Sequence, residues 1–163
     1  MTTVATTSSV IQRHSPSRSA RYEWVAARIC SGDSQSITWQ LDNKAFDTVA
    51  AVFRESNRPD WDGYGAKPVS PEACTEAVKF ISNLPVTFPM PQVIAEPDGD
   101  LALEWYVKKS HLFVIGFSGK GSISYNGVFG QDTKIHGCEP LTDELPRVVC
   151  ESIRRLLAFG NPS

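Results

Sequence analysis

Between residues 93 and 129 the chain contains four short, mostly apolar segments separated by turns, and this pattern constrains the fold more than any other feature. Leu101–Val107 places apolar side chains at every second position, as in a strand with one buried face. His111–Phe117 is an almost continuous apolar run, which is typical of a central strand. With the shorter segments Val93–Ala95 and Ser122–Tyr125, the pattern predicts an antiparallel β-meander of three to five strands.

One turn in this region has a strong local signal. Asn126-Gly127 is the dipeptide that type I′ hairpin turns prefer, because both central residues of such a turn need a positive φ. We therefore expect a strand to end at Tyr125 and Val128-Phe129 to pair back.

Helices are expected both before and after the meander in the sequence. Apolar residues recur at helical spacing over residues 44 to about 56. A second helix begins after Ser70, which is a favourable N-cap, with Pro71 at the first position and Glu72 near the positive end of the dipole; Asn83 and a following proline end it. A last helix is predicted from about residue 145 to residue 159. The fold class is therefore α+β, with two helices first, then the meander, then a C-terminal helix packed on the sheet.

The N-terminal part of the chain carries weaker signals. Residues 1–21 are rich in Thr, Ser, Pro and Arg and are expected to form a flexible tail, whereas residues 22–160 are expected to form a single α+β domain. Residues 22–29 fit a short helix or a strand equally well. Ser36–Leu41 alternates apolar and polar residues and predicts a short strand.

Composition excludes several classes of protein. The 163 residues carry a net charge of −2, so the protein as a whole has no positive electrostatic field that would favour binding to nucleic acid or to an anionic membrane. The N-terminus has no long apolar run, so neither a signal peptide nor a membrane anchor is predicted. The four cysteines form no C-x-x-C pair, and we expect reduced thiols in a cytoplasmic protein.

The candidate working surface is a loop in which acids, glycines and aromatic rings alternate. Asp60–Ala66 has this composition, and Glu96–Asp100 is a partial echo of it that leads into the Leu101 strand. The sharp reversal predicts a positive φ at Gly63 or Gly65. We also expect the ring of the tryptophan in the loop to be largely buried. The predicted binding residues are Trp61, Asp62, Tyr64, Asp98, Glu104 and Trp105.

Metal binding is the alternative role for the same acidic residues. Closely spaced carboxylates are oxygen ligands for hard cations, and a metal-dependent hydrolase would need the two loops to converge in space. The calcium-loop pattern is incomplete, because the bidentate glutamate after the glycine is missing. The residues of this alternative site are Asp60, Asp62, Glu96, Asp98 and Glu104.

No complete catalytic pattern is found elsewhere. A G-x-S-x-G elbow is absent, and His136 with Cys138 lacks a third, orienting group. Ser118–Ser122 is rich in glycine but lacks the P-loop spacing, so it is interpreted as a hairpin turn. No catalytic residue, resident metal or cofactor is therefore predicted.

The loop and the hairpin together resemble a group of small bacterial and phage-associated proteins of unassigned function. In that group a WDGxGA-x-P-x-S loop opens a helix that ends in LP, and a PDG…LEW hairpin follows. The matching residues are Trp61 to Ala66, Pro68, Ser70, Pro71, Leu84-Pro85, Pro97-Asp98-Gly99 and Leu103-Glu104-Trp105, within about residues 57–130. The resemblance implies a bacterial or phage origin and no particular reaction.

These observations favour a non-enzymatic binding protein over an enzyme. We expect an accessory or regulatory protein of a bacterial or phage system that binds a protein partner, with no membrane partner and no nucleic acid. The sequence does not predict the oligomeric state.

Overall fold

The computed structural model describes residues 42–160, so the predictions for residues 1–21, 22–29 and 36–41 lie outside the described part. Within this part, helices and strands follow the predicted order. The elements are α2 (Asp42–Ser56), α3 (Pro71–Ser82), β1 (Gln92–Ala95), β2 (Leu101–Lys108), β3 (His111–Phe117), β4 (Ser122–Phe129), β5 (Lys134–Pro140) and α4 (Arg147–Ala158).

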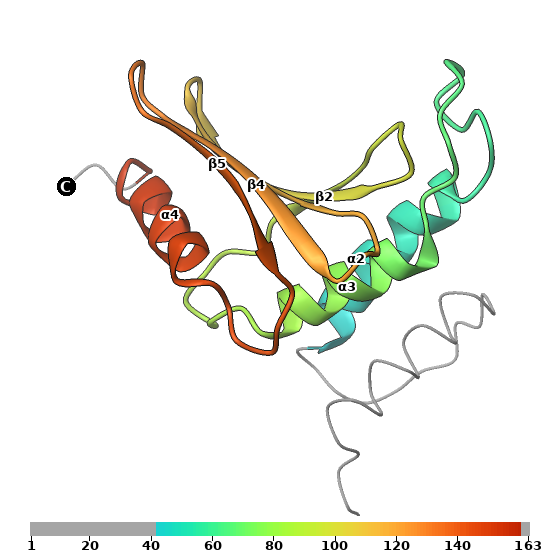
Figure 1. Ribbon diagram of the computed structural model, residues 1–163, viewed down its shortest axis with the longest axis horizontal. Helices are drawn as coiled ribbons and strands as arrows, with labels where there is room; N and C mark the ends of the chain where they lie inside the picture. The colour runs from blue at the N-terminus through green and yellow to red at the C-terminus, as the bar shows by residue number, and fades with distance from the viewer. Residues whose placement is uncertain (1–41, 161–163) are drawn as a thin grey trace, which may run out of the picture.

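The strands form one antiparallel sheet in the order β1-β2-β3-β4-β5, so every strand pairs with its neighbour in sequence. The α+β prediction is confirmed, including the meander and the helix that follows it (Figure 1). β3 is the middle strand, as its apolar run predicts.

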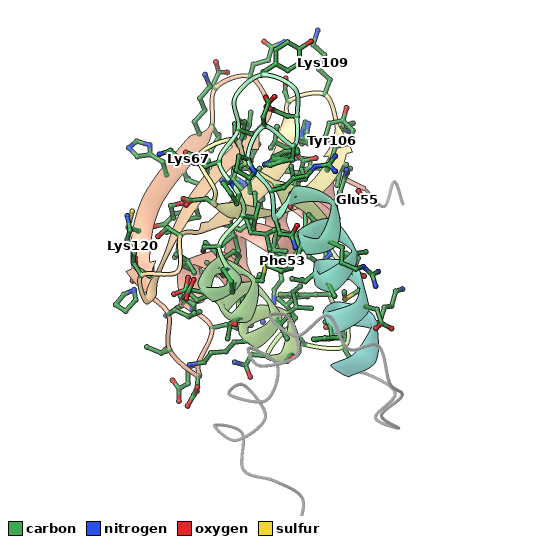
Figure 2. All side chains as sticks on the ribbon, turned by 90° about the vertical axis from the view of Figure 1, so that its right-hand side faces the viewer. Phe53, Glu55, Lys67, Tyr106, Lys109 and Lys120 are labelled. Carbon is green, nitrogen blue, oxygen red and sulfur yellow. The ribbon has the colours of Figure 1, made fainter. Side chains whose placement is uncertain are left out.

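The three helices of residues 42–160 lie on one face of the sheet. The Phe80 ring of α3 packs edge-on against Phe117 at 5.5 Å, and Phe159, the C-cap of α4, packs against His111 at 4.5 Å. Phe117 and His111 are six residues apart on β3, so their side chains share a face. α2 packs beside α3 and over β1. Figure 2 shows Phe53 directed inward from α2 and Glu55 directed outward.

The opposite face of the sheet is not covered by any helix or strand of the described residues. The strand register shows which residues are neighbours on this face: Glu104 is aligned with Val114, Asn126 and His136 in successive strands. Tyr106 on this face is 61% exposed. None of the helices within residues 42–160 is long and apolar enough to cross a bilayer.

The prediction of a hairpin at Asn126-Gly127 is wrong. β4 continues through both residues to Phe129, and Gly127 pairs with Phe113 on one side and Ile135 on the other. A Cβ at Gly127 would lie 2.7 Å from the Phe129 ring and 3.0 Å from each of these two side chains, so the glycine is needed for close packing inside the sheet. The chain turns after Gly130, whose φ is +95°.

The predicted start of the second helix is confirmed, and that of the last helix is confirmed to within two residues. Ser70 Oγ accepts a hydrogen bond from the N–H of Ala73 at 3.0 Å, as an N-cap does. The last helix begins at Arg147, two residues later than predicted, because Pro146 takes the N-cap position. Its buried side includes Ser152, whose hydroxyl donates to the carbonyl of Val148.

The glycine-rich turn between β3 and β4 holds a carboxylate of the chain itself. The N–H groups of Gly119 and Gly121 donate to the two carboxylate oxygens of Glu76 on α3, at 2.9 and 2.6 Å. Converging backbone N–H groups of a tight turn suit an anion, and the Glu76 carboxylate is that anion here. This contact ties the turn to the helix layer.

Candidate interaction site

The loop after α2 is held in shape by its own carboxylates. Asp60 Oδ1 accepts from the N–H of Gly65 at 2.7 Å. Asp62 Oδ1 accepts from the N–H groups of Tyr64 and Ala66 at 2.8 and 3.1 Å. A backbone bond from Asp60 N–H to the Ala66 carbonyl, 2.8 Å long, closes the loop. The acids therefore act as turn-forming residues, the role in which Asp is common.

Both glycines of the loop have left-handed backbones, with φ of +77° at Gly63 and +89° at Gly65. The prediction of a positive φ is confirmed at both positions. Asp60 also has a positive φ, 57°, which aspartate tolerates better than most residues. These conformations let the chain reverse sharply on either side of Tyr64.

The two aromatic residues of the loop have different environments. Tyr64 is 94% exposed, so its ring is held out from the protein. Trp61 is intermediate in burial: most of its surface is covered, as expected, although less completely than that of a core residue. Its Nε1 donates to the carbonyl of Lys67 at 2.9 Å, which anchors the ring across the loop.

The backbone of this loop is bonded to the β1–β2 hairpin. Lys67 N–H donates to the carbonyl of Pro97 at 2.8 Å, and Ser70 N–H donates to that of Gly99 at 3.0 Å. In the hairpin turn, Asp98 Oδ1 accepts from the N–H of Asp100 at 3.2 Å. The two acidic motifs of the sequence are therefore neighbours in space.

The remaining predicted binding residues, Glu104 and Trp105, point to opposite sides of β2. Glu104 lies on the uncovered face of the sheet, opposite Val114. Trp105 is 4% exposed and lies in the core, where its Nε1 donates to the carbonyl of Pro89 at 2.9 Å. We do not include Trp105 in the contact surface proposed below, because a partner cannot touch a side chain at that depth.

Metal-site geometry is not found in the described part of the chain. Within residues 42–160, no three His, Cys, Asp or Glu side chains are arranged so that they could hold an ion. The alternative site of Asp60, Asp62, Glu96, Asp98 and Glu104 therefore has no geometric support there.

The acids of the hairpin repel one another. Partial burial raises the pKa of Glu96 above its ordinary value of 4.5, and the nearby charges of Asp98, Asp100 and Glu104 raise it further. Partial burial also raises the pKa of Asp100, and the charge of Asp98 adds to the shift, whereas Lys120 and Lys67 oppose it. The ionised form of both carboxylates is therefore less stable in the folded protein than in water.

The raised pKa of Glu96, caused first by burial and then by the neighbouring charges, predicts a pH-dependent stability. An acid with a raised pKa binds more protons in the folded state than in the unfolded state, so it destabilises the fold at neutral pH. That loss is recovered as the pH falls through the raised pKa. Glu96→Gln is therefore expected to raise the melting temperature at neutral pH and to have little effect near about pH 4. Thermal melts at the two pH values test this, with the exposed Glu144→Gln as control. A lower melting temperature for Glu96→Gln at neutral pH would contradict it.

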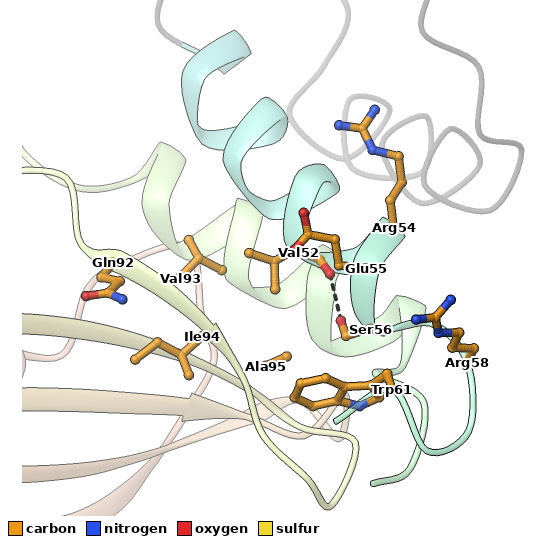
Figure 3. A pocket seen from close by; sticks show the side chains of 10 residues that line it. All are labelled: Val52, Arg54, Glu55, Ser56, Arg58, Trp61, Gln92, Val93, Ile94 and Ala95. Carbon is orange, nitrogen blue, oxygen red and sulfur yellow. Dashed lines mark hydrogen bonds between the residues drawn. The ribbon is translucent and has the colours of Figure 1, made fainter. Parts of the chain in front are cut away.

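A cleft lies beside the loop, where the end of α2 meets the edge strand β1. Its volume is about 630 Å³, and Trp61 forms part of its wall (Figure 3). The other lining residues are Val52, Arg54, Glu55, Ser56, Arg58, Gln92, Val93, Ile94 and Ala95. Sequence reasoning missed this cleft, because no local motif marks two segments that meet only in the folded chain.

Comparison with known proteins identifies no relative: no protein-family model, no curated protein and no solved structure matches the chain.

Proposed function

We propose that the protein is a non-enzymatic binding protein that contacts a protein partner through the Asp60–Ala66 loop. The observation that carries this proposal is the position of Tyr64, a large aromatic residue that is 94% exposed on a loop fixed by internal hydrogen bonds.

The loop has the physical properties of a preorganised contact. Fixing a backbone before binding reduces the conformational entropy lost when the complex forms. Tyrosine is enriched at interfaces, because its ring is rigid and its hydroxyl forms a hydrogen bond at the rim. Asp60 and Asp62 each use a carboxylate oxygen to hold loop N–H groups, so they support the loop instead of serving chemistry.

The setting of this function follows from the sequence. The resemblance of the loop and the hairpin supports a bacterial or phage system, with the chain as an accessory or regulatory component. We place it in the cytoplasm, where the reduced thiols predicted from the cysteine spacing would be stable. The metal-dependent hydrolase has less support: the two acidic loops are neighbours, but within residues 42–160 no three His, Cys, Asp or Glu side chains are arranged so that they could hold an ion.

Co-purification with tagged full-length protein from a bacterial lysate, followed by affinity measurement on the recovered partner, tests the proposal. Tyr64→Ala is expected to weaken binding at least about tenfold, as truncation of an interface aromatic does. Its melting temperature should barely change, because the ring makes few contacts with its own chain. Tyr64→Phe should also lower affinity without changing the melting temperature, if the hydroxyl forms a bond in the complex.

The matched control is Val86→Ala, which truncates another apolar side chain, 86% exposed between α3 and β1. It should leave the affinity unchanged. Equal losses from Tyr64→Ala and Val86→Ala, or a monomer that retains no partner, would contradict the proposal.

A further inference from the structure

We propose that the free edge of β1 receives an extended, acidic peptide segment of a protein partner as an added strand. This inference rests on the proposed function, since it takes the chain to be a protein-binding module. It adds a second contact, beside the Tyr64 loop, and states the chemistry of the segment that fits there.

The hairpin register shows which backbone groups of β1 are free. In an antiparallel pair, opposite residues alternate between those that exchange hydrogen bonds and those that do not. Glu96 N–H donates to the carbonyl of Asp100 at 3.0 Å, which sets the phase of this alternation. Ile94 and Gln92 therefore bond to β2, opposite Ala102 and Glu104. The N–H and C=O groups of Val93 and Ala95 point to the outer edge.

These outward groups have no partner within residues 42–160. β1 pairs with β2 alone, and no other described residue forms a hydrogen bond with the backbone of Val93 or Ala95. Unpaired edge groups are a template on which another chain can form main-chain hydrogen bonds.

Both residues with free backbone groups line the cleft; Ala95 is partly exposed, whereas Val93 is 8% exposed because its side chain packs in the core. The end of α2 borders it on one side, and the Trp61 ring lies beside Ala95 (Figure 3). A volume of about 630 Å³ is within the usual range of ligand-binding clefts. Val52, Ile94 and Trp61 offer apolar contacts to alternate side chains of an added strand.

The charge of the cleft selects an acidic segment. Arg54 and Arg58 are exposed members of its lining, and Glu55 is the one acid among the lining residues. Neither guanidinium forms an ion pair or a side-chain hydrogen bond with another described residue. Arginine binds carboxylates in a bidentate geometry, so a peptide carboxylate is the complementary group.

The other occupants of the cleft fit less well. Residues 1–41 of this chain carry four arginines and only two acids, a net charge of +2 that Arg54 and Arg58 would repel. A second copy that paired β1 with β1 would bring two sets of arginines together. An acidic segment of a different protein avoids these conflicts.

Amide hydrogen exchange on the isolated full-length protein tests whether the edge is free. The Val93 and Ala95 amides should exchange at least about tenfold faster than those of Gln92 and Ile94, because the latter bond to β2. The four residues share one strand, so each pair is the control for the other. Protection of Val93 and Ala95 in a monomer would show that the chain's own N-terminal segment fills the edge, and protection in a dimer would show that a second copy does. Either result would overturn the proposal.

Selection from a library of random twelve-residue peptides tests the chemistry of the occupant. Selected peptides should be enriched in acidic and β-branched residues, and one of them should shift the NMR signals of the Val93 and Ala95 amides and slow their exchange. Arg58→Glu and Arg54→Glu should each weaken that peptide at least about tenfold, because a like charge replaces the bidentate partner. The control Lys44→Glu makes the same charge change near the start of α2 and should have no effect.

Two results would overturn the proposal: no enriched peptides, or selected peptides that shift the β5 edge or the uncovered face instead of β1. Neither result would affect the Tyr64 test, which uses the intact partner. Conversely, loss of the Tyr64 effect with peptides still binding at β1 would remove the proposed loop contact and leave the edge site in place.

Discussion

Trp105→Ala is expected to lower the free energy of unfolding by about 3–5 kcal/mol, as removal of a buried aromatic side chain does. Trp105 is 4% exposed and packs at 6.3 Å from the Phe113 ring in the core. The substitution also leaves the Pro89 carbonyl without the indole N–H that bonds to it. Chemical denaturation measures this loss.

Two further tryptophan variants separate the sources of the effect. Trp105→Phe keeps most of the apolar volume and loses the hydrogen bond, so about 1–2 kcal/mol is expected. Trp61→Ala should cost less than Trp105→Ala, because Trp61 is only partly buried. A loss below about 1 kcal/mol for Trp105→Ala would mean that the indole is not part of the core, and would return Trp105 to the candidate contact surface.

Gly99→Ala is expected to destabilise the fold by about 2–3 kcal/mol, from roughly 1–2 of left-handed strain and about 1 for a weakened hydrogen bond. Gly99 has a φ of +95°, and a Cβ there would lie 2.9 Å from the carbonyl oxygen of Pro68. Such contact forces the backbone apart where Ser70 N–H bonds to the Gly99 carbonyl. Because this bond fixes Ser70, at the end of the segment that follows the Asp60–Ala66 loop, partner affinity should fall as well.

The glycines of the loop are the matched controls for Gly99. Gly63 and Gly65 also have a positive φ, but a Cβ at either would meet nothing within 4 Å. Each alanine variant should therefore be destabilised only by the left-handed backbone strain, about 1–2 kcal/mol. If Gly99→Ala proved no more costly than these two in denaturant titrations, the close approach of loop and hairpin would not contribute to stability.

Helix limits and strand identity were predictable because they depend on neighbours in sequence. Ser70, Pro71 and Glu72 place side chains that stabilise a helix start directly beside the N–H groups they serve. Alternation in Leu101–Val107 placed Leu103 and Trp105 on one face, and both are buried. That alternation was already an argument for Trp105 in the core, although its place in the motif made it a candidate for binding.

Gly127 shows where local information fails. Asn-Gly is a turn signal when the chain is free to reverse, and the same glycine is required where large side chains approach the backbone. A Cβ at Gly127 would meet Phe129 on the same strand and Phe113 and Ile135 on the two neighbouring strands. The strand pairing that brings Phe113 and Ile135 there is not set by residues close to Gly127 in sequence.

The sequence by itself determined the α+β class, the helix starts and the sharp Asp60–Ala66 loop, because capping, alternation and turn chemistry act over a few residues. Only the tertiary structure decided what surrounds that loop. It bonds the loop to the β1–β2 hairpin, leaves Tyr64 exposed and forms the cleft between α2 and β1. The bonds and the cleft join segments about thirty to forty residues apart, and they depend on how the helices pack on the sheet, which no local pattern encodes.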